Sequence, residues 1–127
     1  MPIQLCLLLD AFAVCRFDPH TSIAPLIPIS GFFALTRTDD EVSLVVNEAA
    51  IQPEWQAEPG WRGLKVLGPL DFSLVGILSS LAAPLVESGI SIFAISTYDT
   101  DYLLVKAEKL SSALAALREA GFVILEN

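Results

Sequence analysis

The sequence predicts an α+β fold, and three observations carry this prediction. The chain has 127 residues, of which 54% are hydrophobic and 17% charged, so it can bury one compact core or two small ones. Runs rich in β-branched residues, closed by turn-forming residues, alternate with segments whose apolar positions recur every three or four residues. In the second half these segments follow the order strand, helix, strand, strand, helix, strand.

The first strand and helix of that half are predicted between residues 62 and 88. Residues 62–67 form the strand, which Gly68 and Pro69 close. Asp71 can cap a helix over residues 72–88, because leucine and isoleucine recur there at helical spacing. Gly89 is then the left-handed residue that ends the helix.

A hairpin, a second helix and a last strand complete the second half. Residues 90–97 and 102–106 are strand-like and flank a Tyr-Asp-Thr-Asp turn. A helix follows over residues 108–120 and ends at Gly121, before a short strand at 122–125. The resulting β-α-β-β-α-β order is that of the ferredoxin-like split βαβ sandwich.

The first half is less regular. Residues 19–28 are too rich in proline for more than one helical turn, and residues 52–60 have the composition of a linker. Its predicted strands are residues 3–9 and 12–17, followed by a hairpin of 32–36 with 42–46. This order would make residues 1–60 a degenerate copy of the pattern in residues 61–127, in the form of two tandem units with the first one reduced.

Charge and cysteine content exclude some partners. Seven basic against fifteen acidic residues give a net charge of −8, which argues against a nucleic-acid binder. No uncharged stretch suits a membrane-spanning helix, and the first basic residue is Arg16, so we expect neither membrane insertion nor a leader peptide. Two cysteines in apolar runs fit buried thiols, and we expect a cytoplasmic protein.

A candidate ligand site follows from the strand directions in such a sheet. The loop 68–71 and the hairpin turn 98–101 should lie at the same end, where helix N–H groups can bind a carboxylate and aspartates can bind an ammonium or guanidinium group. The candidate ligand-binding residues are Asp71, Phe72, Ser73, Gly76, Ser96, Thr97, Asp99, Thr100 and Asp101. The alternative is that Asp71 only caps the helix, that the turn aspartates are solvated, and that the glycines serve packing.

Other chemistry is not indicated. Asp99 and Asp101 form a D-x-D pair, but no further acidic cluster accompanies it, so we expect no metal site. His20 is the single histidine, and nothing places a cysteine or serine beside it as a nucleophile. We therefore expect no catalytic residues and no cofactor.

Several stretches resemble the ACT-domain family, in particular small bacterial ACT proteins related to aspartate kinase regulatory regions and to the cytosolic arginine sensors of animals. In the second half these are residues 67–78, 85–93 and 95–105, the last containing Ser-Thr-Tyr-Asp-Thr-Asp-Tyr. In the first half they are residues 12–16 and 36–45. The resemblance thus covers nearly the whole chain.

The resemblance implies two tandem ACT-like units in a regulatory, non-catalytic protein. ACT domains commonly bind an amino acid at the interface between paired units, which implies an amino-acid sensor acting as a homodimer. Because no catalytic domain accompanies these units, the signal would pass to another protein. The hydrophobic strand 122–125 offers an edge for pairing. The alternative is a protein–protein interaction module that pairs without any ligand.

Overall fold

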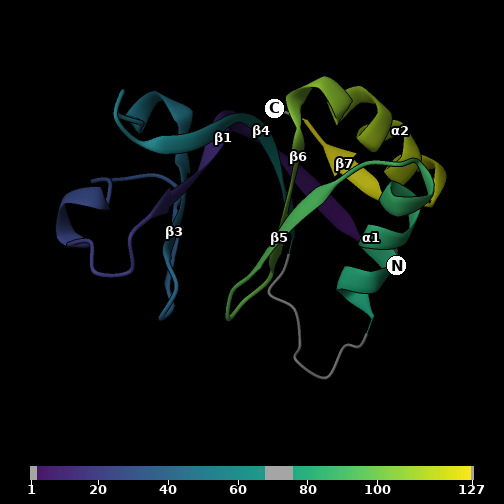
Figure 1. The fold of residues 1–127 in the computed structure, drawn as a ribbon. Coiled ribbons are helices and arrows are strands. Elements are labelled where there is room, and N and C mark those ends of the chain that lie inside the picture. The colour runs from purple at the N-terminus through teal and green to yellow at the C-terminus, as the bar shows by residue number, and fades with distance from the viewer. Residues whose placement is uncertain (1–2, 68–75, 127) are drawn as a thin grey trace. The chain divides into compact units, whose positions relative to one another are not determined.

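The computed structural model describes residues 3–67 and 76–126, which fold into two compact units (Figure 1). The major unit consists of Met1–Leu9 with Arg62–Asn127, and the minor unit is Asp10–Trp61. The elements in chain order are β1 (Gln4–Phe17), η1 (Ala24–Leu26), β2 (Ala34–Arg37), β3 (Val42–Asn47), η2 (Glu48–Ala50), β4 (Gln56–Val66), α1 (Ile77–Glu87), β5 (Ile92–Ser96), β6 (Asp101–Lys106), η3 (Ala107–Lys109), α2 (Leu110–Glu119) and β7 (Val123–Leu125). The elements η1, η2 and η3 are single turns of 3-10 helix.

The major unit has the predicted β-α-β-β-α-β order, from β4 through α1, β5, β6 and α2 to β7. Helices α1 and α2 lie together on one side of this unit's sheet (Figure 1). Leu81 and Leu85 of α1 and Leu117 of α2 are fully buried in the core of the unit. The apolar spacing that predicted a buried helix face therefore marks the residues that form this core.

Residues 4–9 of β1 also belong to the major unit and stand between β7 and β4 in its sheet, whose order is β7-β1-β4-β6-β5. Strand β7 pairs parallel with β1, with Leu5 opposite Ile124. On the other side of β1, the Leu67 N–H donates to the Gln4 carbonyl at 2.9 Å. Leu5 is completely buried, so the start of the chain supplies part of this core.

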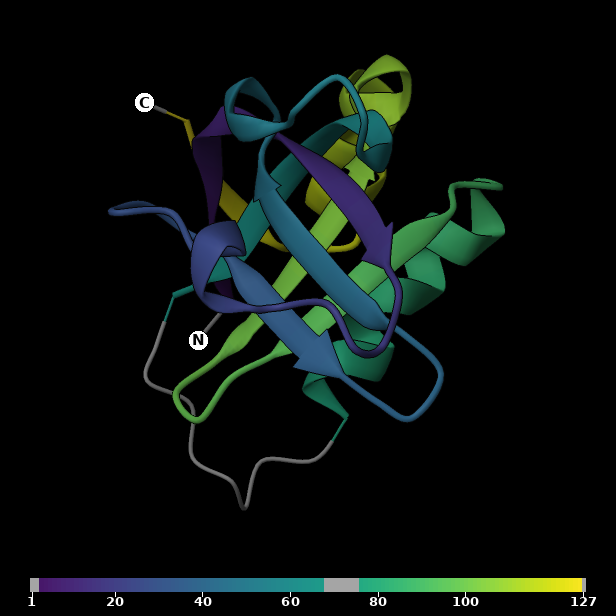
Figure 2. The same cartoon turned by 60° about the vertical axis from the view of Figure 1, so that its left-hand side comes forward.

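The minor unit repeats the same element order with its helices reduced to the turns η1 and η2. Its strands follow the order β2-β3-β1-β4, and Figure 2 shows β1, β3 and β2 side by side. Cys15, Val42 and Leu44 are fully or almost fully buried at its centre, and the rings of Phe17 and Trp55 meet edge to face at 5.1 Å. The α+β, ferredoxin-like fold with a reduced first unit is therefore confirmed.

Two predicted boundaries in the first half are wrong. The stretches 3–9 and 12–17 form one continuous strand, β1, with Asp10 inside it. The predicted linker 52–60 is strand β4 from Gln56 onward. Pro59 lies inside this strand, although proline has no N–H to donate to a ladder. Gly60 beside it has a φ of 84° and donates its N–H to Glu48 Oε2 at 3.0 Å.

Both helices end where the glycines predict. Gly89 has a φ of 72°, and the next N–H, of Ile90, donates to the Leu85 carbonyl at 2.9 Å. Gly121 ends α2 in the same way, with a φ of 101°. The predicted start of the first helix at residue 72 lies outside the described residues. Neither described helix has the length and apolar content needed to cross a bilayer.

Candidate functional site

The turn between β5 and β6 carries five of the predicted site residues. Strand pairing brings Ser96 opposite Asp101, and the chain reverses between them. The Thr97 N–H donates to the Thr100 carbonyl at 2.8 Å, and the Thr97 hydroxyl donates to the same carbonyl at 3.0 Å. In return the Thr100 N–H donates to Thr97 Oγ1 at 3.2 Å. The two threonines thus hold the turn in one conformation.

Thr100 also fixes this turn to the end of β4. Its side chain is buried, with the residue only 5% exposed, and its hydroxyl donates to the Val66 carbonyl at 2.6 Å. Val66 is the last residue of β4 and stands two positions before Gly68. The contact therefore holds the turn beside the C-terminal end of β4.

Two carboxylates, those of Asp99 and Asp101, lie at this end of the hairpin. Asp99 is exposed, whereas Asp101 is half-buried and its Oδ1 accepts a hydrogen bond from the Ser96 hydroxyl at 2.7 Å. That bond orients the Asp101 carboxylate. Two carboxylates at one turn favour an ammonium or guanidinium group. The Thr100 hydroxyl, by contrast, donates its proton to the Val66 carbonyl, which fixes the position of the turn.

The other predicted site residues belong to the loop and the helix start. Gly76 is exposed, has a φ of 81° and stands at the N-cap of α1. Asp71, Phe72 and Ser73 lie outside the described residues. Among residues 3–67 and 76–126, no three histidine, cysteine or acidic side chains come together in a way that could hold a metal ion.

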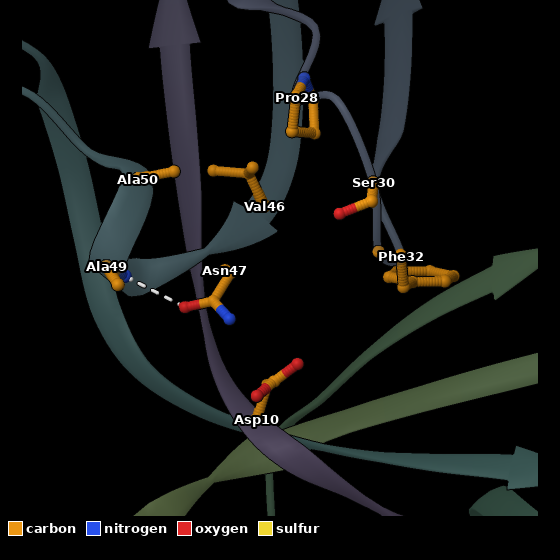
Figure 3. A pocket seen from close by; sticks show the side chains of 9 residues that line it. Asp10, Pro28, Ser30, Phe32, Val46, Asn47, Ala49 and Ala50 are labelled. Atoms are coloured by element: carbon orange, nitrogen blue, oxygen red, sulfur yellow. Dashed lines mark hydrogen bonds between the residues drawn. The ribbon is translucent and has the colours of Figure 1, made fainter.

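A pocket of about 350 Å³ lies in the minor unit, and sequence reasoning did not find it (Figure 3). Its lining residues come from the middle of β1, from the segment before β2, and from the junction of β3 with η2. They are Asp10, Pro28, Ser30, Gly31, Phe32, Val46, Asn47, Ala49 and Ala50. One signal was present in the sequence, because Asp10 places a charge inside an otherwise apolar run from Leu5 to Cys15.

The two cysteines differ in burial. Cys15 is 1% exposed in the core of the minor unit, and this burial raises the pKa of its thiol. A buried neutral thiol is a poor nucleophile, so the position of Cys15 is that of a core residue. Cys6 is half-buried in the part of β1 that belongs to the major unit.

Comparison with known proteins identifies the relatives of this chain. A family model described as an ACT domain matches residues 56–119, and a model of an N-terminal domain matches residues 10–55. The chain is 33% identical over 97 residues to the bovine cytosolic arginine sensor for mTORC1 subunit 1, and the human counterpart is 31% identical over 99 residues. These alignments cover 68% and 69% of this chain, which spans 30% of the length of each sensor.

Solved structures agree with this assignment. A protein of Agrobacterium tumefaciens is 35% identical with a TM-score of 0.93, and the alignment covers 100% of this chain and 95% of that one. The regulatory subunit of aspartate kinase from Thermus thermophilus shares the fold at 16% identity and a TM-score of 0.64, over 92% and 97% of the two chains. The chain belongs to the ACT-domain family.

Proposed function

We propose that this chain is a non-catalytic regulatory protein of the cytoplasm that senses an amino acid. The ligand would lie at the β5–β6 end of the major unit, at an interface between paired ACT units of a homodimer. Another protein would receive the signal. The names of two relatives support this proposal, since one is a cytosolic arginine sensor and another a regulatory subunit of aspartate kinase.

The observation that carries the proposal is the hydrogen bond from Thr100 to the Val66 carbonyl. It holds the acidic turn next to the end of β4, from which the chain continues toward residues 68–73. Asp99 and Asp101 can bind the ammonium group of an amino acid, and the helix N–H groups predicted at residues 72–74 suit its carboxylate. The two ends of a zwitterion would thus be bound by adjoining segments.

A thermal-unfolding screen of the full chain with the twenty amino acids at millimolar concentration tests this function. We expect one amino acid, or a small chemical group of them, to raise the Tm. At a hundredfold excess over Kd, binding to the folded state alone stabilises it by about 2.7 kcal/mol, which is readily measured.

Matched variants assign the response to the site. Asp99→Asn with Asp101→Asn should abolish the Tm shift, whereas Asp39→Asn, an exposed carboxylate in the β2–β3 turn, should preserve it. If no amino acid moves the Tm, the sensing function is wrong. The second function, pairing without a ligand, then gains support from Val123 and Leu125, which expose 37% and 46% of their surface on β7.

A further inference from the structure

We propose that the pocket of the minor unit is a second small-molecule site, and that it binds a small organic cation with a primary ammonium or guanidinium group. This site is separate from the turn Ser96–Asp101, and the inference does not rest on the proposed sensing function. Its lining contains one acidic side chain, Asp10, and no lysine, arginine or histidine. The charge of the pocket therefore favours a cation over an anion.

Polar groups from three separate segments meet in this pocket. Figure 3 shows the Asp10 carboxylate from β1, the Ser30 hydroxyl and the Asn47 carboxamide facing the same space. Asp10 and Ser30 are exposed, so a ligand can reach them without rearrangement of the fold. Together they offer a carboxylate for the cationic group and a hydroxyl that can accept one of its hydrogens.

Asn47 is held in one orientation. Its Oδ1 accepts the Ala49 N–H at 2.9 Å, which caps the turn η2. Because the oxygen is engaged by the backbone, the NH₂ group is the end turned away from η2, toward the Asp10 side of the pocket (Figure 3). The carboxamide thus adds a donor, so an ammonium ligand that also carries a hydroxyl or carbonyl oxygen can be bound at both ends.

The remaining wall is aromatic and aliphatic. Phe32 borders the pocket, and its ring packs edge to face on Phe12 at 5.6 Å with an interplanar angle of 77°. Phe12 is only 2% exposed, so it fixes the Phe32 ring against the core. An aromatic ring attracts cations within about 6 Å of its centre. The alkyl chain of the ligand would lie along the apolar residues Pro28, Val46, Ala49 and Ala50.

The size of the pocket fits a ligand of this class. A volume of about 350 Å³ is near the lower end of the roughly 300–1,000 Å³ range of small-molecule sites. Gly31 forms part of the rim with a φ of 86°, a conformation that other residues adopt at a cost, so the shape of this rim depends on glycine.

Amide chemical-shift titration of the ¹⁵N-labelled full chain tests the proposal with three probes of similar size: butylamine, butanol and butyrate. We expect butylamine to shift the amides of Ser30, Gly31, Phe32 and Asn47 saturably. Butanol and butyrate should shift them at least tenfold less at equal concentration. Agmatine, which carries both a guanidinium and an ammonium group, should bind more tightly than butylamine.

Two variants complete the test. Asp10→Asn keeps the size of an exposed side chain and should reduce the affinity for butylamine at least tenfold, while Asp39→Asn removes the same charge outside the pocket and should leave it unchanged. Unaltered thermal unfolding of both variants shows that the fold is intact. The proposal is wrong if butyrate binds as well as butylamine, if no probe shifts these amides, or if Asp10→Asn binds normally.

Discussion

Thr100 is the residue on which the geometry of the candidate site depends most. Its buried hydroxyl donates a hydrogen bond to the Val66 carbonyl. Its N–H and carbonyl form hydrogen bonds with Thr97 that close the turn. We expect Thr100→Val to lower the free energy of unfolding by about 1–3 kcal/mol, because the isosteric side chain leaves a buried carbonyl without that donor. Urea unfolding measures this change.

Thr100→Ser is the matched control for that substitution. Serine keeps the hydroxyl and loses one methyl group, so it should recover most of the lost stability and retain the response to the amino acid. A Thr100→Val variant as stable as the wild type, with a destabilised Thr100→Ser variant, would show that the methyl packing of Thr100 matters and that the hydroxyl does not hold the turn.

Cys15 makes the stability of the minor unit sensitive to high pH. Burial raises the pKa of its thiol above the ordinary value of 9.0, so in the folded state the thiol keeps its proton at a pH where the unfolded chain has released it. The unfolded state then binds fewer protons, and the free energy of unfolding falls as the pH rises above about 9, by at most about 1.4 kcal/mol per pH unit.

Urea unfolding of wild type and Cys15→Ala at pH 7, 8.5 and 10 measures this contribution. The wild type should be the more stable protein at pH 7, because the alanine variant leaves a cavity in the core. The difference in the free energy of unfolding between the wild type and Cys15→Ala should become smaller toward pH 10. An advantage that is constant or grows with pH would contradict the burial of a neutral thiol.

At the scale of elements, we expect strand β7 to be the surface through which two copies of the chain pair. It pairs with β1 on one side and is an edge of the major unit's sheet, with Val123 and Leu125 exposed. Arg118 of α2 anchors the strand through Glu126, at 2.7 Å, and through the Ile124 carbonyl, at 3.4 Å. An exposed apolar edge is a natural site of strand pairing.

Sedimentation velocity at micromolar concentration should therefore show a dimer. Leu125→Lys puts a charge on this edge, and we expect it to weaken the dimer at least tenfold. Val86→Lys is the control, because Val86 is 66% exposed on α1 and lies outside β7. A monomeric wild type would refute dimerisation. If Leu125→Lys leaves the affinity of the dimer unchanged, the interface lies elsewhere than on β7.

Elements of the second half could be predicted because their signals are local. Helical periodicity, the glycines at 89 and 121, and the Tyr-Asp-Thr-Asp turn each act within a few residues of the structure they determine. The place of residues 4–9 between β7 and β4 could not be predicted, since it depends on pairing with strands at the far end of the chain.

For the molecule as a whole, the family and the fold follow from sequence more readily than the binding sites do. The acidic turn was predictable because strand directions place it at a known end of the sheet, and Thr100 lies where that reasoning requires. The pocket of the minor unit could not be predicted, because Asp10, Ser30 and Asn47 are far apart in the chain and come together only in the fold. The division into a degenerate ACT-like unit at residues 1–60 and an ACT domain at residues 61–127 stays a prediction.

Binding of an amino acid at the β5–β6 turn is the function we propose for this ACT protein. Amide chemical-shift mapping of the labelled full chain, with the amino acid that raises the Tm most, tests it directly. We predict saturable shifts centred on residues 96–101, lost in the Asp99→Asn, Asp101→Asn variant and retained in Asp10→Asn. Shifts confined to other residues, or none at millimolar concentration, would contradict it.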